Sequence, residues 1–431
     1  MTEVIHRPVD HPPGPDALIE EARHRQRRRR TWIALVLSSV VAIGSLVFVL
    51  SGGSSQKPPS IGSHAFPPAP AVIAHWTPLN TATGGLPPGA QINSLVKFDG
   101  NVVAAGQYLS GAGPVAPGYP SAAGPVVWSS PDGTTWTKVW DAGGVVLGTG
   151  TGMTLVRAPG RLLLFNGGTA GSALWSSTDA VHWTRVGLPD AMAALAVGGA
   201  IWGHGLYVVL LSNKFIGGPV TAFGDSDTVW TSSDGTHWQL SALGPPAYLG
   251  SIVSTTTGFL IGGQVLGTSK AMTWSSNDAT HWSASPLGDQ RGQVTVATDM
   301  NTWVATVTTP IRNAPNPFGY TSTTTSFWWS RPGTKWTRAL GPQPGRLSPS
   351  PRFVTEALPS GFMSIGAFDA MPVWFSTTGR SWARATNTGA PHTPILTIVP
   401  EENGFMAFTQ TWGPTSNSPL EPRWWRVLLS A

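Results

Sequence analysis

Residues 128–136 read WSSPDGTTW, and five later segments repeat this arrangement of a Trp, a Ser two residues on, and a second Trp eight residues after the first. The five are WSSTDAVHW (175–183), WTSSDGTHW (230–238), WSSNDATHW (274–282), WWSRPGTKW (328–336) and WFSTTGRSW (374–382). Successive copies begin 44 to 55 residues apart. A sequence period of this length is typical of propellers and related repeat folds.

The residues between these segments read as short strands. Each repeat holds a turn, in most copies with a glycine, followed by an apolar run, such as 99–106 or 159–165, and preceded by another short β-branched stretch. Four short strands per repeat are typical of a propeller blade. We therefore expect an all-β propeller over residues 73–431, which we also expect to be monomeric.

The two ends of this region complete each other. Trp424 opens a seventh copy that lacks its second half, whereas His75-Trp76-Thr77 matches the second half of the other copies. We therefore expect a seven-bladed β-propeller closed by an N-terminal strand, preceded by a single transmembrane helix that is described below.

The segment Ser130-Pro131-Asp132-Gly133 resembles the Asp-box, or bacterial neuraminidase repeat, of sialidase-like propellers. In such a turn the Ser and Asp oxygens accept hydrogen bonds from backbone amides, and Gly supplies a positive φ. We expect this structural role for Ser130, Asp132, Ser177, Asp179, Ser232, Asp234, Ser276 and Asp278. The other two complete copies have Pro332 and Thr378 in place of Asp, which favours a turn-stabilising role over a catalytic one.

The same resemblance implies that a ligand binds on the face opposite these turns. That face would carry the connections between second and third strands, four of which are long: 109–124, 212–227, 310–326 and 411–422. Long loops in compact folds are often functional. The candidate ligand residues on this face are Tyr119, Asp225, Asp227, Asp289, Arg291, Arg312, Tyr320 and Asp369. Arg352 and Glu356 share one face of the sixth inner strand, where they are expected to pair in the channel.

The chemistry of a sialidase is missing from this face. Resemblance to that family implies an arginine cluster, a Tyr nucleophile with a Glu partner, an Asp acid and an early Arg-Ile-Pro-like segment, and no such segment exists in this sequence. We therefore expect no catalytic residues, and a non-catalytic binding or scaffold module for a protein or glycan partner. The alternative is a sialidase-like or other glycoside hydrolase of cell-surface glycans, which would need two carboxylates about 5–10 Å apart.

Neither a metal nor a cofactor is expected. The chain has 21 Trp and no Cys, which excludes disulfides and thiolate metal sites. His75, His182, His237 and His281 lie on different blades, too far apart for one metal centre. The net charge is only +5 and seven arginines lie in the first 30 residues, so the body lacks the basic face that binds nucleic acid.

The N-terminal region reads as a membrane anchor. Residues 31–50 carry no charge and directly follow the arginine-rich run 23–30. About 20 apolar residues span a bilayer, and flanking positive charge marks the cytoplasmic side. We expect a basic cytoplasmic tail (1–31), a single-pass helix (32–50), a Gly/Ser/Pro-rich linker (51–72) and an extracytoplasmic propeller at the cell membrane. The alternative is a cleaved signal peptide, whose apolar part is typically about 7–15 residues.

Overall fold

The computed structural model describes residues 71–79, 86, 90–109, 122–143, 152–168, 171–212, 226–310, 323–341, 346–347, 353–366, 372–391, 395–411 and 421–430. The expected tail (1–31) and membrane span (32–50) lie outside the described residues, as does the linker up to residue 70. Within the described ranges, no helix is both long and apolar enough to cross a membrane.

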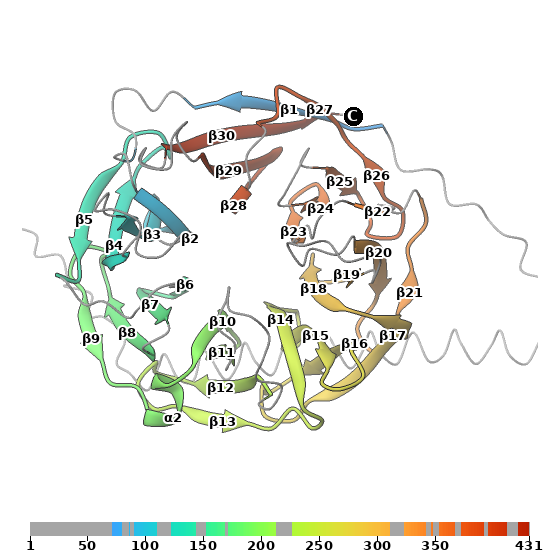
Figure 1. The fold of residues 1–431 in the computed structure, drawn as a ribbon, viewed down its shortest axis with the longest axis horizontal. Helices are drawn as coiled ribbons and strands as arrows, with labels where there is room; N and C mark the ends of the chain where they lie inside the picture. Colours follow the sequence, from blue (N-terminus) through green and yellow to red (C-terminus); the bar gives the residue numbers. More distant parts are fainter. Residues whose placement is uncertain are drawn as a thin grey trace, which may run out of the picture. The chain divides into compact units, whose positions relative to one another are not determined.

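Seven separate sheets stand around a central channel, so the predicted seven-bladed β-propeller is confirmed (Figure 1). The strands nearest the channel are β2 (Ala90–Phe98), β6 (Gly152–Ala158), β10 (Ala196–Gly203), β14 (Ala247–Ser254), β18 (Gln293–Thr298), β23 (Phe353–Leu358) and β28 (Ile395–Glu401). The second strands are β3 (Asn101–Leu109), β7 (Arg161–Gly168), β11 (Leu206–Ser212), β15 (Phe259–Val265), β19 (Trp303–Pro310), β24 (Gly361–Gly366) and β29 (Gly404–Thr411).

The outer half of each blade begins with the strand that carries the first Trp of the repeat. These third strands are β4 (Ala122–Ser130), β8 (Gly171–Ser177), β12 (Thr228–Ser232), β16 (Lys270–Ser276), β20 (Thr323–Ser330), β25 (Val373–Ser376) and β30 (Glu421–Ser430). The outermost strands are β5 (Thr137–Asp141), β9 (Thr184–Val186), β13 (Gln239–Ser241), β17 (Ser283–Arg291), β21 (Thr337–Arg338), β26 (Ala383–Arg384) and, in blade 7, β1 (Ile73–Pro78). Outside this scheme, helix α2 (Asp190–Ala193) precedes β10, β22 (Arg346–Leu347) pairs with β20, and β27 (Thr386–Thr388) follows β26.

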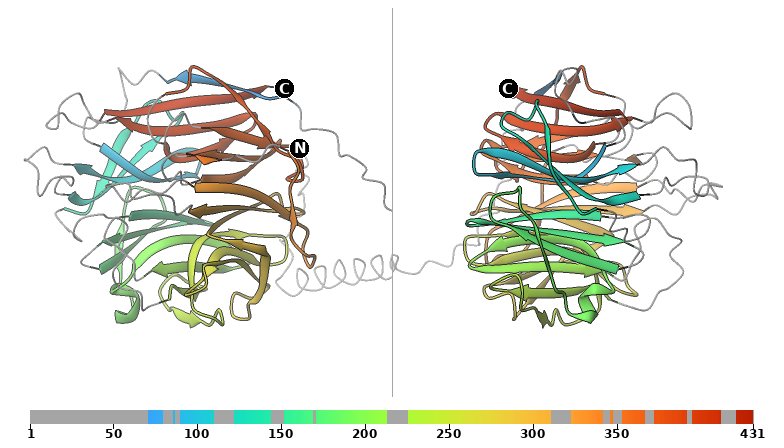
Figure 2. Two further views of the ribbon diagram at one scale, coloured as in Figure 1. Left: turned by 45° about the vertical axis from the view of Figure 1, so that its right-hand side comes forward. Right: turned by 90° about the vertical axis from the view of Figure 1, so that its left-hand side faces the viewer.

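The ring closes as the sequence predicts. β1 pairs antiparallel with β30 from Ile73↔Ser430 to Pro78↔Trp425, and so supplies the outer strand of blade 7. Its other edge pairs in parallel with β27, from the connection between blades 6 and 7. Figures 1 and 2 show β1 at the rim of the ring, next to β30. The closing strand is therefore held on both edges.

The hydrophobic core is divided among the junctions between blades. Each of seven buried clusters draws its residues from two neighbouring blades, and one joins blade 7 to blade 1. In that junction Trp424 stacks on Trp136 with ring centroids 4.9 Å apart, as Phe327 stacks on Trp382 at 4.2 Å between blades 5 and 6. Stability thus depends on every junction being complete, including the one that joins the last blade to the first.

The register of blade 7 corrects one prediction. In other blades the first Trp pairs with the residue two positions after the second Trp, as Trp128 does with Lys138. The corresponding pair in blade 7 is Trp425 with Pro78, so Trp425, and not Trp424, is the first Trp of the seventh copy. A shift of one residue moves a side chain to the other face of its strand, and Trp424 accordingly packs at the next junction.

The Ser-Asp turn, which joins the third and outer strands, has the hydrogen bonds expected from its sequence. In blade 3, Asp234 Oδ1 accepts the amides of Thr236 and His237, each at 2.8 Å, and Ser232 Oγ accepts the amide of Gly235 at 2.8 Å. The imidazole of His237 also donates from Nδ1 to Asp234 Oδ2 at 2.7 Å. The sequence assigns these histidines no role, and the structure makes them partners of the turn carboxylate in blades 2, 3 and 4.

The backbone conformation of the turn is kept in two blades that have alanine in place of glycine. Gly235 has φ +75°, and Ala180 and Ala279 occupy the same position in blades 2 and 4 with φ +64° and +58°. A non-glycine residue is strained in this region. Both alanine side chains are buried in the clusters of their junctions, which offsets part of that strain.

Acid sensitivity follows from the four turns that keep an aspartate. Amide and imidazole donors hold the pKa values of Asp132, Asp179, Asp234 and Asp278 well below their usual range. A carboxyl whose pKa is lower in the folded chain than the ordinary 3.8 stabilises the fold above that pH, and this contribution is lost as the pH falls. Asp234→Asn should therefore lower the Tm by a few degrees at neutral pH, with a difference that shrinks in acid.

Differential scanning calorimetry at a series of pH values measures this difference. Asp289→Asn is the matched control, because Asp289 is exposed and makes no hydrogen bond in the described structure. An equal effect of Asp234→Asn at all pH values would show that the carboxylate charge contributes nothing to the turn.

Candidate functional site

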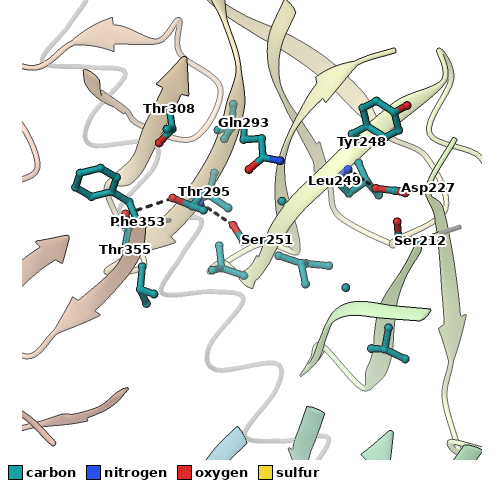
Figure 3. A pocket seen from close by; sticks show the side chains of 18 of the residues that line it. Ser212, Asp227, Tyr248, Leu249, Ser251, Gln293, Thr295, Thr308, Phe353 and Thr355 are labelled. Carbon is teal, nitrogen blue, oxygen red and sulfur yellow. Dashed lines mark hydrogen bonds between the residues drawn. The ribbon is translucent and has the colours of Figure 1, made fainter. Parts of the chain in front are cut away.

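A cavity of about 480 Å³ opens inside the channel, between the inner strands of blades 3 to 6 (Figure 3). Its walls include the first residues of β14 and β18, the last residue of β11 and Asp227, which precedes β12. These positions lie at the end of the blades from which the inner strands start. The Ser-Asp turns lie at the other end, so the cavity is on the face that the sequence assigned to ligand binding.

The lining carries nine polar side chains among glycine and apolar residues. Seven residues contribute a hydroxyl or amide: Ser212, Tyr248, Ser251, Gln293, Thr295, Thr308 and Thr355. Two contribute a carboxyl, Asp227 and Glu356. Lys, Arg and His are absent from the lining formed by the described residues. The remaining lining is glycine and apolar side chains, among them Phe353.

Hydrogen bonds between blades fix the wall formed by β14. Asp227 Oδ2 accepts the amide of Leu249 at 2.6 Å, which ties the start of β12 to the inner strand of blade 4. Ser251 Oγ accepts the amide of Val296 from blade 5 at 2.8 Å (Figure 3 draws both side chains). Between them, a Cβ on Gly250 would lie 2.2 Å from the carbonyl oxygen of Val294, so this close approach requires glycine. The wall is therefore preorganised.

A cluster of hydroxyls joins blades 5 and 6. Thr355 Oγ1 lies 2.8 Å from Thr306 Oγ1, 3.0 Å from Ser364 Oγ and 3.3 Å from Thr295 Oγ1. Thr306, Thr355 and Ser364 are buried, and buried polar groups are normally satisfied in this way. The cluster locks β23 against β18 and β19, and β23 carries Glu356.

Glu356 is the second carboxyl of the lining, and unlike Asp227 it holds no backbone amide. Its carboxyl has no hydrogen-bond or ion-pair partner among the described residues. Arg352, its predicted partner, lies outside the described residues, so that pair stays a prediction. Burial raises the pKa of Glu356 to about 7 from an ordinary 4.5. A carboxyl perturbed by desolvation inside a cavity is a common mark of a functional site.

The shifted pKa predicts how Glu356 affects stability. Its proton is held more tightly in the folded chain, so the fold is favoured below about pH 4.5 and loses this advantage as the pH rises through about 7. Glu356→Gln removes the charge without changing the shape of the side chain. It should raise the Tm by a few degrees in mildly alkaline buffer and leave it unchanged in acid, as thermal denaturation at both pH values would show. A lower Tm in alkaline buffer would contradict this prediction.

Of the candidate ligand residues, the structure brings only Asp227 into the cavity, where its carboxylate holds a backbone amide. Asp289 and Arg291 lie exposed on β17, the outer strand of blade 4, and are not among the described residues that line the cavity. Tyr119, Asp225, Arg312, Tyr320 and Asp369 lie outside the described residues. In the described ranges, no group of three or more His, Asp or Glu side chains is arranged to hold a metal.

Sequence reasoning missed most of the lining. It searched the loops, whereas Tyr248, Ser251, Gln293, Thr295 and Thr355 stand on inner strands. These residues could have been found from the sequence, because the inner strands are recognisable and polar residues interrupt their apolar pattern. The position of the cavity depends on close approaches between blades, such as that at Gly250. No sequence pattern predicts these approaches.

No family model and no curated protein matches the chain. Among solved structures, a protein of unknown function from Dyadobacter fermentans is similar, with a TM-score of 0.47 and 13% identity over 85% of this chain and all of that one. YCF48 bound to a D1 peptide has a TM-score of 0.46 and 12% identity, covering 84% and 99% of the two chains. A sialidase of Trypanosoma rangeli in complex with sialic acid scores 0.39 at 12% identity, over 84% of this chain and 58% of the sialidase. These similarities concern the propeller fold alone.

Proposed function

We propose that this propeller is a non-catalytic binding module that holds a protein or glycan partner in the channel cavity. The observation that carries this proposal is the preorganised polar wall, in which Ser251, Asp227 and the hydroxyl cluster around Thr355 join neighbouring blades. Such a rigid pocket with a few oriented polar groups is typical of ligand sites. A fold of this type hosts many functions, so the cavity and not the fold supports this proposal.

The lining favours binding over sialidase chemistry. A sialidase binds the carboxylate of its substrate through arginines, and the described lining contains two carboxyls and no cation. One carboxylate oxygen of Asp227 also accepts a hydrogen bond from the amide of Leu249. An anionic sugar would meet like charge here, whereas a neutral or cationic ligand would not.

One observation favours the alternative, a glycoside hydrolase. A carboxyl that stays partly protonated near neutral pH is suited to act as a general acid, and Glu356 has this property. It would need a second carboxylate across the cavity, for which Asp227 is the described candidate. Assays with a panel of fluorogenic glycosides decide the matter: turnover by the wild type that Glu356→Gln abolishes would establish the hydrolase and overturn the proposal.

Filling the cavity tests the binding site. Thr308 lines the cavity and its side chain makes no hydrogen bond in the described structure, so Thr308→Trp should block the cavity while sparing the walls. Leu240→Trp is the control, because Leu240 is 61% exposed on the outer strand β13. On glycan and peptide arrays, the ligands of the wild type should be lost with Thr308→Trp and kept with Leu240→Trp. Identical array patterns for all three proteins would place the site elsewhere.

We further propose that residues 32–50 anchor the chain and that the propeller is extracytoplasmic. The uncharged span behind an arginine-rich run supports this orientation. Because the chain has no Cys, single cysteines report topology without background. In intact cells, an impermeant maleimide should label Ser54→Cys but not His6→Cys. The reverse pattern would refute the orientation, and loss of an N-terminal tag would indicate a cleaved signal peptide.

A further inference from the structure

The charge balance of the cavity is one-sided. Its described lining holds the carboxyls of Asp227 and Glu356 and no basic group. The strands packed on β23 are β18, β19, β24 and β28, and their one titratable residue is Glu401, which is already paired with Arg426 at 3.1 Å. Across the cavity stand Asp227 and the phenol of Tyr248. Glu356 therefore meets no counter-charge from the described structure.

Glu356 is partly exposed to the cavity, and a desolvated carboxylate without a partner is costly. Burying an ion without compensation disfavours the charged form, and an apolar or amide side chain would avoid that cost. An unpaired desolvated charge is expected where a ligand supplies the counter-charge. A neutral glycan offers hydroxyls but no positive charge, so it would leave Glu356 uncompensated.

The neighbouring groups suit a ligand with several N–H donors. Gln293 and Thr308 line the same cavity, and neither side chain makes a hydrogen bond in the described structure. Figure 3 shows both on the side of the cavity that also carries Thr295 and Thr355. An amide oxygen, a hydroxyl and a carboxylate are acceptors for a guanidinium or an ammonium group.

We infer that the cavity receives the basic side chain of a peptide, an arginine or a lysine, and that Glu356 is its counter-ion. This inference rests on the proposed function and narrows it to a protein partner with an exposed basic residue. A charge-assisted hydrogen bond in an enclosed site is stronger than a neutral one. Binding of a cation also favours the ionised carboxylate, so it expels the proton that Glu356 holds near neutral pH.

Two matched probes test the role of charge. N-acetyl-arginine methylamide and N-acetyl-citrulline methylamide have nearly the same shape, but only the first is charged. Ligand-observed NMR titration of the full chain should show saturable binding of the arginine probe, with the citrulline probe about tenfold or more weaker. Glu356→Gln should remove this preference. Glu402→Gln is the control, because Glu402 is exposed in the turn after β28, at the opposite end of the blades.

Proton release gives a readout that a purely structural role of Glu356 would not move. Calorimetric titrations of the arginine probe near pH 7, in two buffers of different ionisation enthalpy, should show release of a proton by the wild type and none by Glu356→Gln. Affinity for the arginine probe should also rise between about pH 5.5 and 8.5, because arginine stays charged while Glu356 ionises.

These experiments distinguish a wrong ligand class from a wrong binding site. Equal binding of the two probes, unchanged binding by Glu356→Gln, or no saturable binding of either probe would overturn this inference. If Thr308→Trp nevertheless abolishes array binding, the proposed site stands with a different ligand class. If Thr308→Trp changes nothing on the arrays and the probes do not discriminate, both the site and its ligand class are wrong.

Discussion

Deletion of residues 73–80 should unfold or aggregate the propeller, because it removes the strand that closes the ring. The deletion takes away β1, whose side chains Ala74 and Trp76 are 0% and 5% exposed in the junction between blades 6 and 7. It also leaves the hydrogen-bonding edge of β30 bare, which invites pairing with other chains. Loss of one buried Trp alone costs about 3–5 kcal/mol, so we expect the Tm to fall by about 10 °C or more.

A matched deletion of residues 63–70 is the control, since it shortens the preceding chain by the same length and leaves β1 intact. Circular dichroism melts report the Tm of both variants. If the deleted protein is soluble enough to study, a synthetic peptide of residues 71–80 added in trans should raise its Tm in a concentration-dependent way. An unchanged Tm after deletion of 73–80 would refute the closure.

Truncation of a buried Trp is the second change with a large expected effect. Trp274 is 0% exposed and fills the junction between blades 3 and 4. Trp274→Ala leaves a cavity that a closed ring cannot collapse without disturbing two blades. We expect the free energy of unfolding to fall by about 3–5 kcal/mol, measured by urea denaturation with an unchanged m-value.

Two companion variants make this result specific. The indole Nε1 of Trp274 has no hydrogen-bond partner in the described structure, so Trp274→Phe, which retains much of the apolar volume, should cost well under half as much. Leu240→Ala, on the exposed outer strand of blade 3, should have almost no effect. A loss below about 1 kcal/mol for Trp274→Ala would show that the junctions are not the main source of stability.

The fold was predictable because its repeat is visible in the sequence. The number of Trp pairs at a fixed spacing predicts the number of blades, and the unmatched Trp76 identifies the closing strand. What the repeat could not resolve was the choice between Trp424 and Trp425. Both residues of this pair are aromatic and buried, so only the pairing of β30 with β1 decides which one belongs to the repeat.

The cavity was less predictable than the ring. The sequence indicates the face of the cavity and two of its lining residues: Asp227, from a long connection at that end of the blades, and Glu356, from the inner strand of blade 6. The expected pair of Glu356 with Arg352 stays a prediction, because Arg352 lies outside the described residues. A partner cannot be assigned from strand spacing alone, since a neighbouring blade or a ligand meets the same face.

The closing strand has a mechanical consequence. A force applied to β1 along the direction of the strand is carried by its pairing with both neighbouring strands. Six residue pairs with β30 and three with β27 lie across that direction, so they bear the load together in shear instead of separating one after another. The strand that joins the propeller to the preceding chain is thus also held against separation from the ring by pairing on both edges.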